Sequence, residues 1–166
     1  MNRSTIANST ARKFLLRALV LTISLIPVGS NPLRAYSEPR ASSERSHSVK
    51  IELKIGSKIL TASLADNATA RDFASLLPLS LSMNDLFGRE KYGDLPRALS
   101  EKSPPKNRYE VGEIAYWSPD HQVAIYYRQD GAMIPPPGVI PIAKIDAGTG
   151  VFNVPGSVKV TIKIAK

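Results

Sequence analysis

The clearest pattern in the chain is strict alternation of apolar and polar residues in two segments, residues 49–55 and 158–164. Val, Ile and Leu alternate with Lys and Glu in the first segment, and Val and Ile alternate with Lys and Thr in the second. A period of two puts all apolar side chains on one face of a strand. Gly56 and Ser57 suit a tight turn, and residues 58–64 then return as a partner strand. The pattern predicts a β-hairpin at the start of the folded region and a strand at its end.

A short helix is expected directly after the hairpin. Thr69, with Asp72 three residues later, resembles a helix N-terminus, and residues 69–77 carry apolar side chains on one side. Pro78 ends this helix. Residues 67–69 also match a glycosylation sequon, but a capping and turn role is the preferred interpretation.

Further short strands are predicted at residues 79–83, 113–117, 122–128 and 139–145. Residues 84–109 are rich in Gly and Pro and are predicted to form a loop with room for one short helix near residues 96–100. Residues 129–138 contain three consecutive prolines and cannot form a central strand. Pro141 indicates that its strand lies at an edge or contains a bulge.

These elements predict a mainly β domain of six or seven short strands and one good helix. Each strand is apolar on one face, so the strands must enclose one core by curling or by stacking two sheets. A small closed antiparallel β-barrel is the preferred architecture, because the helix at residues 69–77 would close one of its ends. A β-sandwich is the alternative.

The N-terminal segment predicts export. Residues 1–37 contain five basic residues and no acidic residue, and they surround an apolar run at residues 18–26. This is the layout of a cleavable signal peptide. Cleavage after Ser30, Ala35 or Ser37 is compatible with the small residues there. The alternative, an uncleaved membrane anchor, is disfavoured because the apolar run is shorter than the roughly 20 residues needed to span a bilayer.

The remaining chain is expected to comprise a polar linker, residues 38–48, and one folded domain, residues 49–166. The protein is therefore predicted to be soluble and secreted or periplasmic, without stable membrane insertion after cleavage. The sequence has 22 basic and 14 acidic residues, and removal of the five leader cations leaves 17 against 14, a net charge of +3. Because these charges are scattered, we expect no nucleic-acid partner. With no Cys and only two His, no metal site or cofactor is predicted.

Several stretches together resemble the bacterial and archaeal cyclophilin-like domain family, small barrel proteins without a settled activity. The stretches are residues 66–79, 89–91, 94–100, 111–116, 124–127 and 137–142. The likeness covers residues 49–164, and it implies a cyclophilin-like barrel. The sequence departs from the family pattern at Glu113, where Asp is frequent, at Tyr126, where Phe is frequent, and at Ala143, where Gly is usual.

Candidate catalytic groups are missing from the pattern. Nucleophile elbows, paired carboxylates on one face and Gly-rich phosphate loops are all absent from the sequence. True cyclophilins carry Phe-His-Arg and Gln-Phe-Phe stretches that have no counterpart here, so the resemblance implies no catalytic residue. Arg97, Arg128, Trp117 and His121 are of the types used in prolyl isomerisation, but their spacing does not bring them together.

The predicted hairpin at residues 113–128 is the most aromatic part of the chain. One face of each strand would fill the core, and the other would present large rings near a surface, as suits a peptide or small apolar ligand. The candidate ligand-binding residues are Arg97, Glu113, Tyr116, Trp117, Tyr126, Tyr127 and Arg128. The alternative interpretation is aromatic pairing that only stabilises the sheet.

The sequence thus favours an exported binding module for a peptide or small ligand, with no catalytic activity expected. Two alternatives stay open. The protein could be an extracytoplasmic prolyl isomerase that assists folding, or an interaction partner that pairs through an exposed edge strand near Val139. The sequence leaves the ligand and the oligomeric state open.

Overall fold

The two alternating segments become neighbouring strands of one barrel. A computed structural model describes residues 48–166, and it confirms the opening hairpin, β1 (Lys50–Ile55) and β2 (Lys58–Leu64). The last strand, β8 (Val158–Ile164), pairs antiparallel with the free side of β1. The apolar faces of these strands point into the barrel, where Ile51 and Leu53 have no exposed surface. The predicted leader and residues 38–47 of the predicted linker lie outside the described residues.

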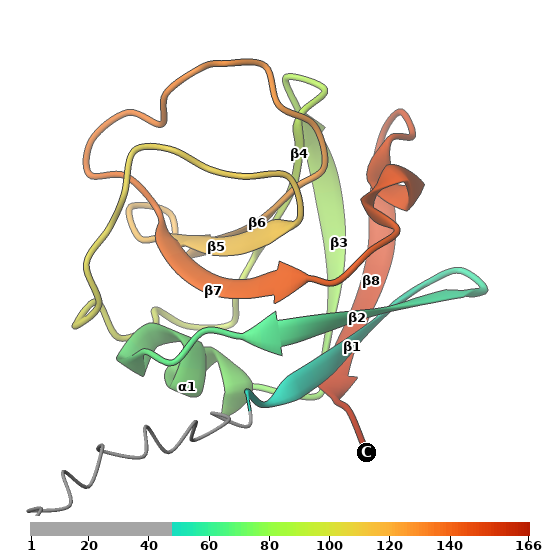
Figure 1. Cartoon of the computed structure of the whole chain (residues 1–166), viewed down its shortest axis with the longest axis horizontal. Coiled ribbons are helices and arrows are strands. Elements are labelled where there is room, and N and C mark those ends of the chain that lie inside the picture. Colours follow the sequence, from blue (N-terminus) through green and yellow to red (C-terminus); the bar gives the residue numbers. More distant parts are fainter. Residues whose placement is uncertain (1–47) are drawn as a thin grey trace, which may run out of the picture. The chain divides into compact units, whose positions relative to one another are not determined.

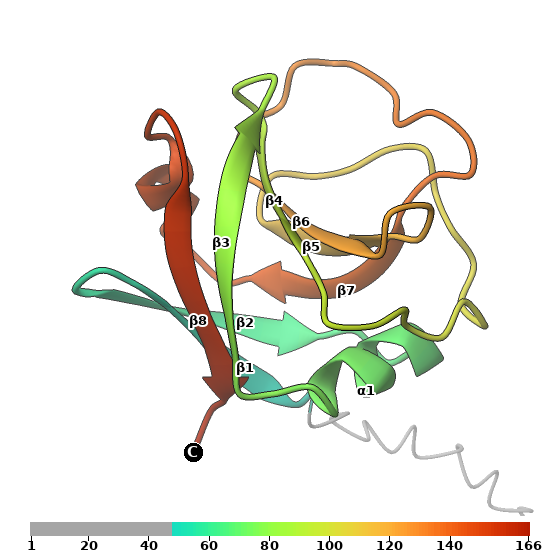
Figure 2. The ribbon, with the colours of Figure 1, turned by 180° about the vertical axis from the view of Figure 1, so that it is seen from behind.

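The barrel is closed and antiparallel, as Figures 1 and 2 show from opposite sides. Its other strands are β3 (Leu79–Leu86), β4 (Glu90–Asp94), β5 (Glu113–Trp117), β6 (Gln122–Tyr126) and β7 (Ile140–Ile145). The strands follow one another around the barrel in the order β1-β2-β7-β5-β6-β4-β3-β8. This arrangement confirms the barrel over the sandwich.

Closure of the barrel corrects the hypothesis of an exposed edge strand, and the pairing of β7 confirms the irregularity predicted at Pro141. β7 pairs with β2 on one side and with β5 on the other, so it offers no free edge. The expectation of an exposed edge strand near Val139 is therefore wrong. The pairing of β5 with β7 shifts register between Ile114 and Ala115, where Ala115 lies opposite Pro141. This confirms the irregularity that the proline indicated, because proline lacks the N–H that a regular ladder needs.

The helix forms where it was expected, but its first turn is built differently. α1 spans Ala68–Ala74, and its N-cap is Asn67, whose side chain accepts a hydrogen bond from the Ala70 N–H at 2.8 Å. Thr69, the predicted start, instead lies inside the helix and donates its hydroxyl to the Ser100 carbonyl at 2.6 Å. Capping by Asn67, two residues earlier, satisfies the Ala70 N–H and leaves the Thr69 hydroxyl free to hold the loop at residues 95–112. A 3₁₀ turn, η1 (Thr149–Phe152), precedes β8.

β4 is an element that the sequence pattern did not predict. Residues 84–109 were expected to be a loop with room for a short helix near residues 96–100. The loop is confirmed only from residue 95 onward, because β3 continues to Leu86 and β4 follows, and residues 96–100 form no helix. The inward positions of β4 are Lys91, which is fully buried, and Gly93, whose Cα faces Met83 and Leu81. With Lys and Gly on the inner face, this strand lacks the apolar alternation that marks the others.

The buried apolar residues form two separate clusters. The larger fills the barrel and includes Phe73 of α1, which lies at the lower end of the barrel in Figure 1. The smaller lies on the outer face of β5 and β6, under two long loops at residues 95–112 and 127–139. No helix in the part of the chain that the structure describes is long and apolar enough to cross a membrane.

Candidate functional site

A pocket of about 380 Å³ opens on the outside of the barrel, and we call it the outer pocket. Its floor consists of side chains from β4, β5 and β6, and its walls come from the β3–β4 turn and from the loop at residues 127–139. Figure 1 shows both long loops, in yellow and orange, on the same side of the barrel as β5 and β6.

Strand register explains which side chains meet in the outer pocket. Residues that point out of the barrel share one face, and the pairing places Glu90 opposite Tyr126 and Tyr92 opposite Ala124. In the neighbouring ladder, Trp117 lies opposite Gln122. Side chains directly opposite each other on antiparallel strands are in contact distance. The register thus gathers one carboxylate and three aromatic rings on one patch of sheet.

The loops at residues 95–112 and 127–139 cover one side of this patch. Tyr109 stacks on Tyr126 with ring centroids 4.1 Å apart. The loops are tied to each other by a pair of backbone hydrogen bonds, each 2.9 Å long, between Lys106 and Val139. Gly138, at φ +88°, permits this approach, because an added Cβ would lie 2.6 Å from the Lys106 carbonyl oxygen. A glycine is needed at that point for both reasons.

An ion pair lies at the base of the outer pocket. The side chains of Arg89 and Glu90 are only 8% and 7% exposed, and Arg89 Nε lies 3.5 Å from Glu90 Oε2. Among the described residues, neither of these two atoms has a hydrogen-bond partner. Burial raises the pKa of the Glu90 carboxyl, although the positive charge of Arg89 opposes this effect.

Arg89 also contacts a second carboxylate and two aromatic rings. Its Nη1 donates to Asp130 Oδ2 at 3.3 Å, and its guanidinium lies over the rings of Phe87 and Tyr109, 5.1 Å and 5.5 Å from their centroids. The Tyr109 hydroxyl donates to Asp130 at 2.7 Å. This bond, with help from a backbone N–H and from Arg89, lowers the pKa of Asp130 to about 2. Asp130 is therefore ionised at neutral pH and neutralises much of the Arg89 charge.

The β3–β4 turn adds an unusual aromatic residue to the rim. Phe87 has φ 55°, a left-handed conformation that is rare for a bulky residue, and its side chain leaves the residue 71% exposed. It contributes to the outer pocket and to the cation–π contact with Arg89. The left-handed backbone is unfavourable for a bulky residue and the exposed ring buries little surface, so folding alone does not explain a Phe at this position.

Two of the residues predicted to bind ligand line the outer pocket, Trp117 and Tyr126. Trp117 is half-buried and donates its indole N–H to Asp120 Oδ2 at 3.1 Å. Burial and the neighbouring Glu90 charge raise the pKa of Tyr126, so that it stays a neutral phenol. Both belong to the outward face of the aromatic hairpin.

Two other predicted residues lie inside the barrel, on the opposite face of the same strands. Tyr116 has no exposed surface, and its hydroxyl accepts a hydrogen bond from the Leu99 N–H at 3.1 Å. Tyr127 donates its hydroxyl to Asp85 at 2.6 Å. Burial raises the pKa of Tyr127 to about 12. Both rings belong to the core cluster and not to the outer pocket.

The remaining predicted residues are not brought to the outer pocket either. Arg97 forms an ion pair with Asp72 of α1 at 2.6 Å. Glu113 accepts from the Lys106 ammonium and from a backbone N–H, which fastens the start of β5 to the loop before it. Arg128 is exposed beyond the end of β6 and does not line the outer pocket.

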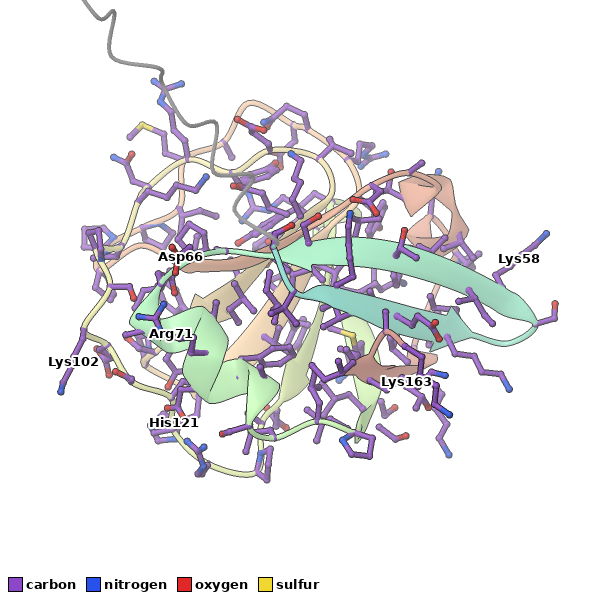
Figure 3. The ribbon with its side chains drawn as sticks, turned by 60° about the horizontal axis from the view of Figure 1, so that its bottom comes forward. Lys58, Asp66, Arg71, Lys102, His121 and Lys163 are labelled. Atoms are coloured by element: carbon purple, nitrogen blue, oxygen red, sulfur yellow. The ribbon has the colours of Figure 1, made fainter. Side chains whose placement is uncertain are left out.

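Figure 3 shows the surface around α1, a helix that contributes no residue to the outer pocket. Asp66 and Arg71 point toward each other there and form an exposed ion pair of 2.8 Å. His121, which is of a residue type that prolyl isomerisation uses, is an exposed turn residue with φ 53°. In residues 48–166, His, Asp and Glu side chains form no cluster suited to a metal ion.

Sequence reasoning missed Phe87, Arg89, Glu90 and Tyr92, because all four lie in or next to the unpredicted strand β4. One signal was present. Residues 89–91 are among the stretches that carry the family resemblance.

A second depression, of about 770 Å³, lies beside the first over the three consecutive prolines. Its walls come from the two loops alone, and it contains no buried ion pair. The outer pocket combines sheet, loops, aromatic rings and buried charge, and its volume is within the range of small-molecule sites. It is therefore the candidate functional site.

Comparisons with known proteins agree with this architecture. A family model described as the cyclophilin-like family matches residues 53–163. The solution structure of the hypothetical protein AF2241 from Archaeoglobus fulgidus is similar, with a TM-score of 0.58 and 23% sequence identity over 74% of this chain and 99% of that chain. At that identity the similarity concerns the fold alone. A search of the curated proteins found no match. On the family match and the closed barrel together, the chain belongs to the cyclophilin-like family.

Proposed function

We propose that this domain binds a small organic ligand, or a single side chain of a peptide, in the outer pocket. The observation that carries the proposal is the buried pair of Arg89 and Glu90 at the base of an aromatic-walled cavity of about 380 Å³. Sites for small molecules are typically apolar concavities with a few polar groups that orient the ligand.

Folding alone gives a weak reason for this pair. A buried ion pair is frequently no more stabilising than apolar residues of similar size, and an unpartnered buried polar atom costs about 1–3 kcal/mol. Arg89 Nε and Glu90 Oε2 are two such atoms. A ligand that moves into the cavity and draws these side chains toward it would supply the missing partners. This reasoning favours a binding role over aromatic pairing that only stabilises the sheet.

The proposal includes export. The basic, acid-free leader with its apolar run supports a signal peptide, so that the binding domain would act outside the cytoplasm. N-terminal sequencing of the mature protein from culture medium or periplasm would test this, and recovery of the full-length chain in the cytoplasm alone would contradict it.

The binding proposal is tested with a fragment library and two matched variants. Ligand-observed NMR would identify fragments, and the fluorescence of Trp117, the sole tryptophan of the chain, would report whether they bind in the outer pocket. Ala124→Leu adds bulk to the pocket, whereas Ser82→Leu adds it to an exposed position on β3. We expect binding to be lost only in Ala124→Leu. If no fragment binds, or if binding survives in a folded Ala124→Leu protein, the proposal is wrong.

One observation favours a second candidate, prolyl isomerisation. Arg89 shares the outer pocket with Phe87 and Trp117, the residue types that prolyl isomerisation uses. The low exposure of Arg89 and its two carboxylate partners count against this candidate. A protease-coupled assay on a proline peptide decides the matter, since acceleration that disappears in Arg89→Lys would favour the enzyme.

A further inference from the structure

The chemistry of the outer pocket also points to the kind of ligand, and this inference rests on the proposed function. Four aromatic side chains from four different parts of the fold line the pocket: Phe87, Tyr92, Trp117 and Tyr126. Aromatic rings attract organic cations through the negative potential of their faces, and sites for quaternary ammonium groups are built from such rings. An apolar ligand without charge would also fit these walls, so the rings alone do not decide the class.

The balance of charge in the outer pocket decides the class of ligand. Two carboxylates, Glu90 and Asp120, line the outer pocket, together with a single cation, Arg89. A third carboxylate, Asp130, lies behind Arg89 and pairs with it. The cluster of these four groups therefore has an excess of negative charge when its carboxylates are ionised. Lys91, next to Glu90 in sequence, is fully buried on the inner face of the barrel, and Arg128 is exposed; neither lines the pocket.

The arrangement of Arg89 leaves room for a second cation. Its guanidinium pairs with two carboxylates, Glu90 and Asp130, and lies over Phe87 and Tyr109, so its positive charge is already compensated. Asp120 lines the pocket, is exposed, and accepts a hydrogen bond from the indole N–H of Trp117. A cation placed against Trp117 would have this carboxylate beside it.

We propose that the outer pocket binds an organic cation, an amine or quaternary ammonium group, among Tyr92, Trp117 and the carboxylate of Asp120. Phe87 serves as an exposed ring that closes over the ligand. This role accounts for a large aromatic side chain that is 71% exposed in a left-handed turn position.

Three probes of the same shape test the inference: choline, the neutral 3,3-dimethylbutan-1-ol, and the anionic 3,3-dimethylbutanoate. Trp117 fluorescence and the single tryptophan indole N–H signal in NMR report binding at the pocket. We expect choline to bind at least fivefold more tightly than the neutral alcohol, which corresponds to a cation–π contribution of ordinary size. The anion is expected to bind most weakly.

Two pocket variants and one control test which side chains bind the cation. Asp120→Asn keeps an oxygen for the Trp117 N–H and removes one negative charge, and we expect it to weaken choline binding about three- to fivefold at low salt without affecting the alcohol. Tyr92→Leu should weaken choline binding by a similar or larger factor. Glu101→Gln removes an exposed acid that does not line the pocket and is expected to change neither probe.

The outcomes separate this inference from the proposed function. If the alcohol or the anion binds as tightly as choline, the ligand is not selected for positive charge and the inference is overturned, while the binding role stands. If none of the three probes affects Trp117, the inference is also wrong, and the fragment screen then decides the binding role independently. Equal effects of Asp120→Asn on choline and on the alcohol would likewise overturn it.

Discussion

Lys91 and Lys144 form ion pairs of the same length in opposite surroundings, and this contrast gives a sharp prediction. Lys91 Nζ lies 2.8 Å from Asp85 with its side chain fully buried, whereas Lys144 Nζ lies 2.8 Å from Glu110 with side chains that are 45% and 73% exposed. Replacing each lysine with Met removes the same type of bond at the same distance. The two pairs differ in burial and in two further hydrogen bonds that only Lys91 makes.

The expected cost at Lys91 follows from its contacts. Besides Asp85, its ammonium donates to the carbonyls of Val154 and Gly156 at 2.6 Å and 2.7 Å, so that it joins β4 to the segment before β8. These two hydrogen bonds and the ion pair with Asp85, taken as three interactions of a charged group, are together worth about 4.5–9 kcal/mol. Dehydration of the ammonium, at several kcal/mol, offsets part of this sum. We expect Lys91→Met to lower the free energy of unfolding by about 3–5 kcal/mol, the usual cost of removing one partner of a buried pair.

Urea unfolding at pH 7, followed by circular dichroism, measures both variants on one scale. Lys144→Met should lower the free energy of unfolding by less than about 1 kcal/mol, because exposed pairs contribute little. Adding Asp85→Asn to Lys91→Met should cost less than Asp85→Asn costs alone, since the carboxylate has already lost its cation. If Lys91→Met costs no more than Lys144→Met, the assignment of Lys91 as a structural cross-link is refuted.

Three further predictions concern the turn, the helix and pH. Phe87→Asn should raise the thermal midpoint, with about 0.5–1 kcal/mol of stabilisation, because Asn tolerates the left-handed conformation; a lower midpoint would mean that the contact with Arg89 outweighs the strain. Asn67→Ala should destabilise the domain by about 1–2 kcal/mol in urea unfolding, because it removes the N-cap bond to Ala70, and an unchanged midpoint would contradict that role. The folded-state pKa of Asp130, about 2, lies below the ordinary aspartate value of 3.8, so its stabilising contribution is present above about pH 4 and is lost as pH falls toward 2. Thermal melts from pH 5 to pH 2 should therefore show a shallower decline in Asp130→Asn than in the native protein, and parallel declines would exclude this contribution.

The aromatic hairpin at residues 113–128 shows how much of the candidate site could be predicted from the local sequence pattern. Alternation places Tyr116 and Trp117 on opposite faces of one strand and Tyr126 and Tyr127 on opposite faces of the next, but both faces carry large rings, so the sequence could not say which face turns inward. The direction of barrel closure decides this. It places Tyr116 and Tyr127 in the core, and the loops then enclose the other pair.

The sequence by itself determined the elements whose burial repeats with the period of a strand. In β1 and β8 every inward position is apolar, and a two-residue turn fixes the first hairpin, so local pattern suffices there. The resemblance of separate short stretches to one family added the closed barrel. The signal peptide is equally a local feature and stays a prediction.

Only the tertiary structure decided β4 and with it the candidate site. One inner position of β4 is a charged residue, Lys91, which can be buried because Asp85 and two carbonyls from the segment before β8 surround it. No local pattern reports the two carbonyls, which are more than 60 residues away in sequence. The same strand carries Glu90 to Tyr126 by register and places Arg89 within reach of Asp130. Burial of charge depends on neighbours that long-range pairing brings together, whereas burial of apolar side chains follows a period that the chain already displays.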